Sequence, residues 1–194
     1  MGKGTTMTKS VAIFLVAGLA LCGPALAAPG DGTTVTLKTG FFFPGGSVFR
    51  EAYSSGPFFG AEVAVPVGGP FRVWGGAELF GKTGRLPVSE ERTKATIVPL
   101  FAGVRAEFGK RGLRPYVGAA AAYFLLHETN PLGAASDGGF GLISQAGLQA
   151  GIARGIRLDA FAGYRACTIR SGGDEALEAD IGGLSAGLGL GFVF

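Results

Sequence analysis

The chain has 194 residues, of which 47% are hydrophobic, 16% are charged and 36 are glycine. The hydrophobic content excludes an intrinsically disordered chain, the abundance of glycine excludes a coiled coil, and the glycines lack the strict Gly-X-Y period of collagen. The formal net charge of +3 at pH 7 is small, and one domain is the default at this length.

The first segment has the pattern of a secretory signal peptide. Lys3 and Lys9 precede an apolar run over residues 11–21, and small residues follow up to Ala25-Leu26-Ala27. The run is well short of the ~20 residues that a helix needs to cross a bilayer. We therefore predict a signal peptide over 1–27, cleaved near Ala27, and a mature domain over 28–194.

Removal of the signal peptide changes both the charge and the cysteine content. The mature chain keeps 15 basic residues against 14 acidic ones, a net charge of +1, so the charge of the precursor does not indicate nucleic-acid binding. Cys22 leaves with the signal peptide, and Leu21 before it disfavours a lipidated cysteine. Cys167 then has no partner for a disulfide, and we expect it to be a small buried side chain within a strand.

The mature chain alternates between apolar residues and small or charged residues, which is the period-two pattern of β-strands. No charged residue falls on the apolar parity of any alternating stretch, and glycine dominates the other parity. In chain order, the eight stretches cover residues 35–43, 59–65, 71–82, 98–108, 116–125, 140–152, 156–165 and 184–194.

The orientation of the two faces decides the class of barrel. A soluble barrel of the lipocalin kind would turn its apolar face inward. Glycine weakens a strand that faces water, whereas the narrow interior of an eight-stranded barrel has room for small residues. Aromatic residues of the apolar parity also gather near the two ends of the stretches, as in membrane barrels: Phe71, Phe108, Phe192 and Phe194 at one rim, and Phe41, Phe43, Phe59, Tyr123, Phe140 and Tyr164 toward the other.

The connections between the stretches alternate in length. Three are short, at Pro66–Pro70, Gly109–Gly112 and Arg154-Gly155, whereas four are long and polar, at Pro44–Pro57, Thr83–Arg92, Glu128–Gly139 and Arg170–Ala179. Short turns at one end and long, solvated loops at the other are typical of outer-membrane barrels. We therefore predict an all-β fold, an eight-stranded antiparallel up-and-down transmembrane β-barrel.

Two local motifs carry a family resemblance. Arg114-Pro115-Tyr116-Val117-Gly118 opens the fifth stretch, and the chain ends in Gly191-Phe192-Val193-Phe194. With the export signal and the eight stretches, these residues resemble the small outer-membrane β-barrel proteins of Gram-negative bacteria, namely the transmembrane domain of OmpA and its OmpX and opacity-protein relatives. The resemblance covers residues 33–194.

The resemblance implies a location and a set of partners. We expect the protein in the outer membrane, in contact with its lipid and with both termini in the periplasm. The barrel assembly machinery would read a C-terminal signal made of Leu190, Phe192 and Phe194. The implied function is non-enzymatic, a structural or surface-interaction role in which a partner binds the extracellular loops, with no cofactor and no nucleic acid.

Ten charged residues on the second parity are predicted to point into the lumen. In that confined space they must form ion pairs, because each unpaired charge would cost several kcal/mol. We interpret them as a salt-bridged plug that closes the barrel, with a narrow passive pore of slight anion preference as the alternative. They are Lys38, Glu62, Arg72, Glu78, Lys82, Arg105, Glu107, Arg157, Asp159 and Arg165.

His127 is the only histidine of the chain and lies in His127-Glu128-Thr129-Asn130. This stretch weakly resembles the His-x-Ser-Asn stretch of outer-membrane lipid A deacylases, which would make His127 the base and Thr129 the nucleophile. Threonine replaces serine, and Asp137 is the one acid that suggests itself downstream. A lipid A-modifying enzyme is therefore a lesser alternative. One histidine and one mature cysteine do not make a zinc site, so we expect no metal.

Overall fold

The strands close into a ring. The computed structural model describes residues 32–85, 92–109, 112–131, 133–171 and 177–194, so the predicted signal peptide and Cys22 lie outside the described residues. In chain order the elements are β1 (Thr34–Pro44), α2 (Ser47–Tyr53), β2 (Gly56–Gly68), β3 (Phe71–Arg85), β4 (Arg92–Glu107), β5 (Leu113–Asn130), β6 (Gly133–Ala153), β7 (Ile156–Ser171), β8 (Leu177–Asp180) and β9 (Gly183–Val193).

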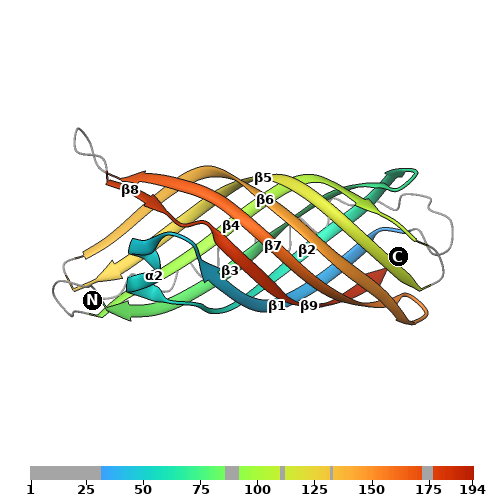
Figure 1. Cartoon of the computed structure of the whole chain (residues 1–194), viewed down its shortest axis with the longest axis horizontal. Coiled ribbons are helices and arrows are strands. Elements are labelled where there is room, and N and C mark those ends of the chain that lie inside the picture. The colour runs from blue at the N-terminus through green and yellow to red at the C-terminus, as the bar shows by residue number, and fades with distance from the viewer. Residues whose placement is uncertain (1–31, 86–91, 110–111, 132, 172–176) are drawn as a thin grey trace.

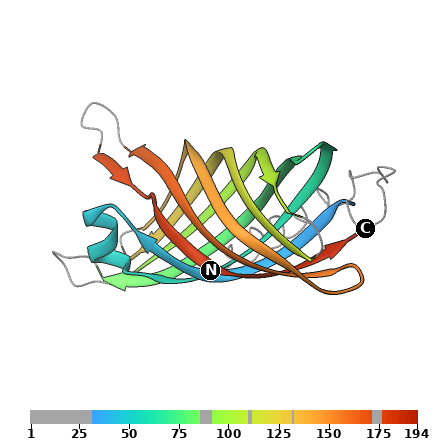
Figure 2. The same cartoon turned by 45° about the vertical axis from the view of Figure 1, so that its right-hand side comes forward.

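Each strand from β1 to β7 pairs antiparallel with the next in sequence, and β9 pairs with both β7 and β1. The short β8 pairs with the outer end of β7, where it prolongs the line of β9 beyond Ile181 and Gly182. β8 and β9 together therefore take the place of the eighth strand of the barrel (Figures 1 and 2). The predicted eight-stranded antiparallel up-and-down barrel is confirmed.

The two ends of the barrel differ in their connections. The three short turns lie at the end where β1 begins and β9 finishes, and there Phe194 N donates to Thr33 O over 2.9 Å. We call this the inner end, and the opposite end, which carries α2 and β8, the outer end. The turn between β2 and β3 has φ of +137° at Gly68 and +55° at Gly69, values that glycine adopts without the steric cost of a side chain.

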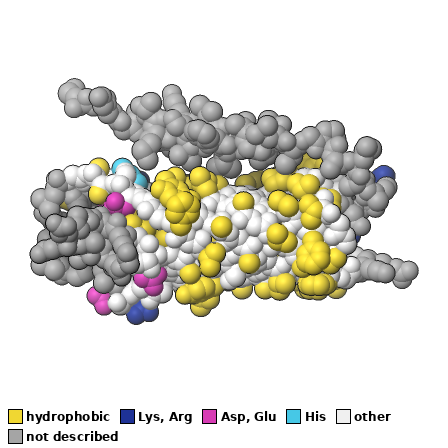
Figure 3. All heavy atoms as spheres, turned by 90° about the horizontal axis from the view of Figure 1, so that it is seen from above, with side chains coloured by type: hydrophobic (Ala, Val, Ile, Leu, Met, Phe, Trp, Pro, Cys, Tyr) yellow, Lys and Arg dark blue, Asp and Glu magenta, His cyan; other side chains and the backbone are white. Residues whose placement is uncertain are grey.

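The exposures of neighbouring residues show which face is inside. Leu158 is 49% exposed, whereas the next residue, Asp159, is 2% exposed. Leu37 and Lys38 show the same contrast, at 56% and 4%. Large apolar side chains therefore form the outer surface, where Figure 3 shows them spread along the wall of the barrel. This arrangement excludes the lipocalin-like orientation.

Lumen-facing glycines leave room for large side chains of other strands. A Cβ at Gly147 would lie 2.6 Å from the Tyr116 ring, and a Cβ at Gly118 would lie 3.2 Å from the Trp74 ring. Both distances are shorter than an ordinary contact between heavy atoms. The glycine-rich parity therefore reflects a crowded interior.

The predicted loop at Glu128–Gly139 is wrong, because β5 and β6 continue as a paired hairpin. Their register runs on to Asn130 opposite Gly133. Antiparallel pairing at a hairpin is local and needs no apolar face once it starts. The apolar alternation stops before the pairing does, so the sequence pattern marked the end of the apolar surface and not the end of the strands.

The predicted solvated loop at Pro44–Pro57 contains α2, which the sequence analysis missed. The helix has 7 residues, too few to show a helical period. It buries Phe49 and Tyr53, which are 7% and 5% exposed. Among the described residues, no helix is long and apolar enough to cross a bilayer.

Candidate functional site

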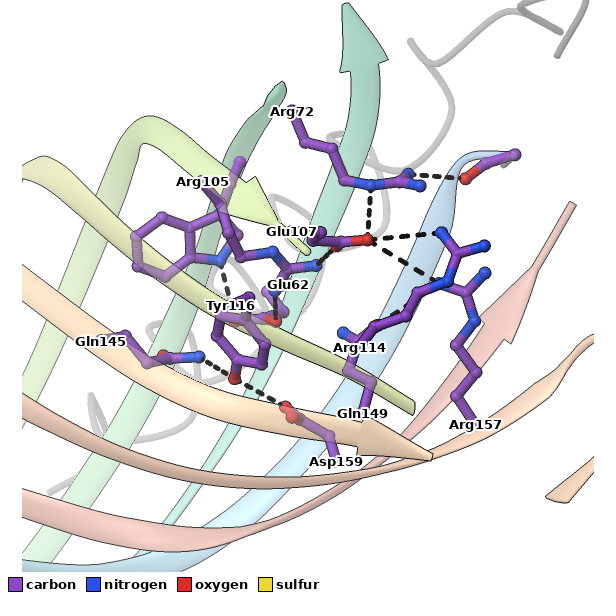
Figure 4. Close-up of polar contacts among 12 residues, drawn as sticks. Glu62, Arg72, Arg105, Glu107, Arg114, Tyr116, Gln145, Gln149, Arg157 and Asp159 are labelled. Atoms are coloured by element: carbon purple, nitrogen blue, oxygen red, sulfur yellow. Dashed lines mark hydrogen bonds and ion pairs between the residues drawn. The ribbon is translucent and has the colours of Figure 1, made fainter. Parts of the chain in front are cut away.

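The inner half of the lumen holds a carboxylate, Glu62, that is 1% exposed and has three donors. Lys38 Nζ lies 2.9 Å from its Oε2, and Arg105 Nη1 lies 2.7 Å from its Oε1. The indole Nε1 of Trp74 donates to Oε2 over 2.9 Å. These donors come from β1, β4 and β3, so one side chain of β2 connects four strands. Figure 4 shows Arg105 directed toward Glu62.

A second carboxylate, Glu107, receives several arginines nearer the inner end. Arg105 Nη2 lies 2.8 Å from Oε1, and Arg72 Nε lies 2.7 Å from Oε2. Arg114 and Arg157 approach Oε2 at 3.9 and 4.0 Å. Arg72 also donates from Nη1 to Gly32 O over 2.9 Å, which ties the segment before β1 to the lumen.

Uncharged side chains connect the two carboxylates to a third, Asp159. Tyr116 Oη donates to Asp159 Oδ2 over 3.1 Å and accepts from Gln145 Nε2 at 2.6 Å. Gln145 Oε1 in turn accepts from Lys38 Nζ at 2.7 Å. Since Lys38 is on β1 and Gln145 on β6, which are not neighbours, this bond crosses the lumen.

These contacts form one continuous chain, which we call the inner network. It runs from Asp159 to Arg72 and takes a side chain from each strand between β1 and β7. The sequence pattern predicted the charged members of the network but not the neutral ones, although the neutral residues lie on the same face of their strands. The missed members are Trp74, Tyr116, Gln145 and Gln149, which accepts from Arg157 over 3.3 Å.

The outer half of the lumen is mainly apolar, which sequence reasoning also missed. Among its described residues, a buried ion pair joins Arg165 to Glu78. The Arg165 guanidinium lies over the rings of Phe42 and Phe58, 4.7 and 4.8 Å from their centroids. The outer half holds six large apolar side chains of 2% exposure or less: Phe42, Phe58, Phe80, Ile97, Phe124 and Ile169.

Three predicted lumen residues therefore lie apart from the inner network. Arg165 and Glu78 form the separate outer pair. Lys82 lies near the outer mouth and donates to Ser55 O over 2.8 Å in an exposed position. Cys167 is a free, buried thiol on β7 in the same outer half.

Helix α2 reaches over the outer mouth of the lumen. Tyr53 Oη donates to Glu128 Oε1 over 2.7 Å, and Thr93 Oγ1 donates to the same oxygen over 2.8 Å. Because Thr93 is on β4 and Glu128 is on β5, the helix that follows β1 is held by the opposite wall. Burial is the main cause that raises the pKa of Tyr53 above its ordinary value.

His127 is turned outward, away from the lumen. Its Nδ1 lies 2.7 Å from Ser136 Oγ, and its Nε2 lies 3.4 Å from Thr129 Oγ1. Glu128 and Asp137 have the opposite parity and turn inward. The structure thus brings the predicted base and nucleophile together and adds Ser136, which no sequence pattern could pair with His127 before the register was known.

The described residues contain no group of three or more histidine, cysteine, aspartate or glutamate side chains placed to hold a metal ion. At the C-terminus, Leu190 and Phe194 are exposed on the outer surface, at 37% and 79%. Phe192 shares their parity and is half-buried.

Neither the comparison with protein-family models nor the comparison with curated proteins finds a match. The comparison with solved structures finds several similar chains. The outer-membrane protein OprG from Pseudomonas aeruginosa has a TM-score of 0.68 and 12% identity, over 87% of this chain and 98% of that one. Neisserial surface protein A has a TM-score of 0.61 and 12% identity, over 87% and 100% of the two chains.

A third similar structure is Ail, the attachment invasion locus protein of Yersinia pestis, in complex with the heparin analogue sucrose octasulfate. Its TM-score is 0.54 and its identity 16%, over 84% of this chain and 99% of that one. All three matches span nearly the whole of the other barrel. The fold of this chain is therefore that of the small eight-stranded outer-membrane β-barrels, which confirms the resemblance seen in its sequence.

Proposed function

We propose that this protein is a non-enzymatic outer-membrane barrel with a closed lumen, which acts through its outer end as a structural or surface-interaction component of the cell envelope. Its location is supported by the outward apolar wall, since soluble monomers rarely expose contiguous apolar patches of more than a few hundred Å². Under this proposal the inner end and both termini face the periplasm, and the barrel assembly machinery reads Leu190, Phe192 and Phe194.

The observation that carries the closed lumen is the inner network. It takes side chains from β1 to β7, and its bonds cross the barrel between strands that are not neighbours. Opening a path would leave buried charges without partners, at a cost of about 3–5 kcal/mol for each broken pair. α2 adds a second obstruction at the outer mouth, held by Glu128. Ions thus meet two closures in series.

The surface role is supported by the protrusion of the outer end. β6 has 21 residues, whereas about 9–11 tilted residues cross the hydrocarbon core. The outer part of the β5–β6 hairpin is therefore free to meet a partner outside the membrane. The similar barrel Ail is called the attachment invasion locus protein, and this name agrees with a role of this kind.

Conductance in planar lipid bilayers tests the closed lumen. We expect no steady single-channel currents from the reconstituted wild-type barrel, and currents from Arg105→Ala, because this change removes the link between Glu62 and Glu107. Leu158→Ala on the outer wall is the matched control and should stay silent. Steady wild-type currents that Arg105→Ala alters would establish the alternative, a narrow passive pore.

A lipid-modifying enzyme is the second candidate, favoured by the 2.7 Å contact between His127 Nδ1 and Ser136 Oγ. A serine hydroxyl within reach of an imidazole is the arrangement of an activated nucleophile. Mass spectrometry of lipid A from cells with and without the protein tests this candidate. Unchanged acyl chains would remove it, whereas a loss that Ser136→Ala prevents would replace the non-enzymatic proposal.

A further inference from the structure

The outward face of four neighbouring strands changes from apolar to polar at one register position. Leu100, Tyr123 and Phe140 are exposed cross-strand partners on β4, β5 and β6, with the last two rings 5.0 Å apart. Four residues further toward the outer end, the outward partners are Gly81, Thr96, His127 and Ser136, and the next outward row is Thr83, Lys94, Thr129 and Ala134.

We call the polar side chains of these two rows the rim patch. Each is exposed or half-buried. The patch contains one lysine, one histidine, four hydroxyl groups and no acidic residue: Thr83, Lys94, Thr96, His127, Thr129 and Ser136.

Among the described strand residues with described side chains, the outward-facing charges around the rim patch all have one sign. Lys94 faces Thr129 and His127 faces Thr96, so Lys94 and His127 are diagonal neighbours, about 7 Å apart. Among the strand residues whose side chains are described, Lys94 is the one lysine or arginine turned outward. The adjacent acids Glu128 and Asp137 turn inward. An anion approaching from outside meets positive charge and hydroxyl groups.

The hydrogen bonds of His127 orient the hydroxyl groups of Ser136 and Thr129 toward a further acceptor. When the imidazole carries two protons, it donates to Ser136 Oγ from Nδ1, 2.7 Å away, and to Thr129 Oγ1 from Nε2, 3.4 Å away. The hydrogens of both hydroxyl groups then point to other acceptors, because each oxygen already accepts from the ring.

We propose that the rim patch binds the phosphate group of an outer-leaflet lipid headgroup. The inference rests on the proposed membrane location, since aromatic girdles mark the interface of a barrel. The patch begins four residues beyond the Tyr123–Phe140 pair, which is about 13 Å along a strand and less along the membrane normal because the strands tilt. This position is level with headgroups, whose phosphates accept hydrogen bonds from hydroxyls and from ammonium groups.

The single histidine provides the measurement. The imidazole proton resonances of His127 are followed by NMR at one fixed pH, with the whole barrel in uncharged dodecyl maltoside micelles. The groups that face the ring are Lys94 and Thr96 from β4, Thr129 on its own strand and Ser136 from β6. We expect short-chain phosphatidic acid to shift these resonances, and the matching diacylglycerol to leave them unchanged.

Three outcomes would overturn the inference. No shift with phosphatidic acid, or an equal shift with diacylglycerol, would mean that the patch does not recognise phosphate. An equal shift with inorganic phosphate at the same concentration would mean that the patch binds a free anion and that the lipid assignment is wrong.

Variants locate the effect. Lys94→Gln should weaken the binding of phosphatidic acid about tenfold, since one charge-assisted contact is lost. Arg154→Gln, in the exposed turn at the inner end, is the matched control and should leave it unchanged. Equal weakening by both variants would show non-specific attraction and overturn the inference. A barrel that inserts into bilayers without discriminating between the lipids refutes this inference alone, whereas a barrel that does not insert refutes the proposed function.

Discussion

The same eight strands line both halves of the lumen, but polar side chains fill the inner half and mainly apolar side chains fill the outer half. The inner half is a chain of directional contacts in which Glu62 and Glu107 each accept from more than one strand. The outer half packs aromatic and branched side chains, such as Phe80 and Ile97, around one pair formed by Arg165 and Glu78. The two halves therefore contain buried ion pairs in two different surroundings, one polar and one apolar.

In the inner half, Glu62, Arg105 and Glu107 each have several partners, so the loss of one of these side chains leaves several others without a partner. In the outer half, the pair has apolar neighbours, and the rings of Phe42 and Phe58 lie against its arginine. Buried pairs with apolar surroundings can often be replaced by hydrophobic residues without loss of stability, whereas a half-removed pair is destabilising. The two halves should therefore respond differently to substitution.

The largest effect is expected from Glu62→Ala. This change leaves Lys38, Arg105 and Trp74 Nε1 without their shared acceptor, at a cost of about 3–5 kcal/mol in the free energy of unfolding. Urea unfolding in detergent micelles, followed by the fluorescence of Trp74, the only tryptophan, measures it. Glu51→Ala in α2 is the control, since Glu51 is exposed. A loss below about 1 kcal/mol would mean that the network is solvated.

The outer pair allows a test that the inner network does not. Arg165→Met alone leaves the Glu78 carboxylate buried without its arginine and should cost about 3–5 kcal/mol. The double change Arg165→Met with Glu78→Leu removes both charges, so stability should return to the wild-type value or exceed it by about 1–4 kcal/mol. The same unfolding assay decides. A double variant as unstable as the single one would show that the pair itself stabilises the outer half.

A smaller effect is expected where glycine makes room for the inner network. Gly147→Ala would place a Cβ 2.6 Å from the Tyr116 ring and hydroxyl, which must displace the contacts to Gln145 and Asp159. Overpacking of this kind costs about 1–3 kcal/mol. Gly151→Ala on the same strand is the matched control, because its nearest atoms would be 3.8 Å away. Equal stability of the two variants would contradict the crowded lumen.

The amount that could be predicted from the sequence also differs between regions of the barrel. The period-two pattern was sufficient to predict that Lys38, Glu62 and Arg105 point into the lumen, because in a strand alternate residues point to opposite faces. It could not predict which lumen residues meet across the barrel. The bond between Lys38 and Gln145 depends on ring closure and register, and no local pattern contains these.

The outer end was predicted less well. The hairpin beyond Glu128 lost its apolar alternation, since both faces there are polar or small, although the backbone pairing continued. The apolar lumen around Phe80 and Phe124 was missed because these rings share their parity with glycines and charges. Apolar residues on both faces weaken the alternation by which strands are recognised.

The smallest effect is expected at the outer mouth, where the hydrogen bond from Tyr53 to Glu128 attaches α2 to the opposite wall. Tyr53→Phe keeps the ring but removes the donor to Glu128 Oε1, at a cost of about 1.5 kcal/mol for a bond to a charged acceptor. The amide of Ser54, which donates to Arg50 O over 3.0 Å, should then exchange with solvent about tenfold faster. Glu51→Ala should not change this rate.

The titration of Tyr53 gives an independent measure of the docking of α2 at the outer mouth. Burial raises the pKa of Tyr53 above its ordinary value of about 10. As the pH rises past that value, an undocked Tyr53 loses its proton while the docked one keeps it, so the docking of α2 must weaken with increasing pH. The tyrosinate absorbance of wild type minus that of Tyr53→Phe should therefore rise with a midpoint above 10. A midpoint at the ordinary value would mean that α2 does not cover the mouth, and the inner network would then be the only closure of the lumen.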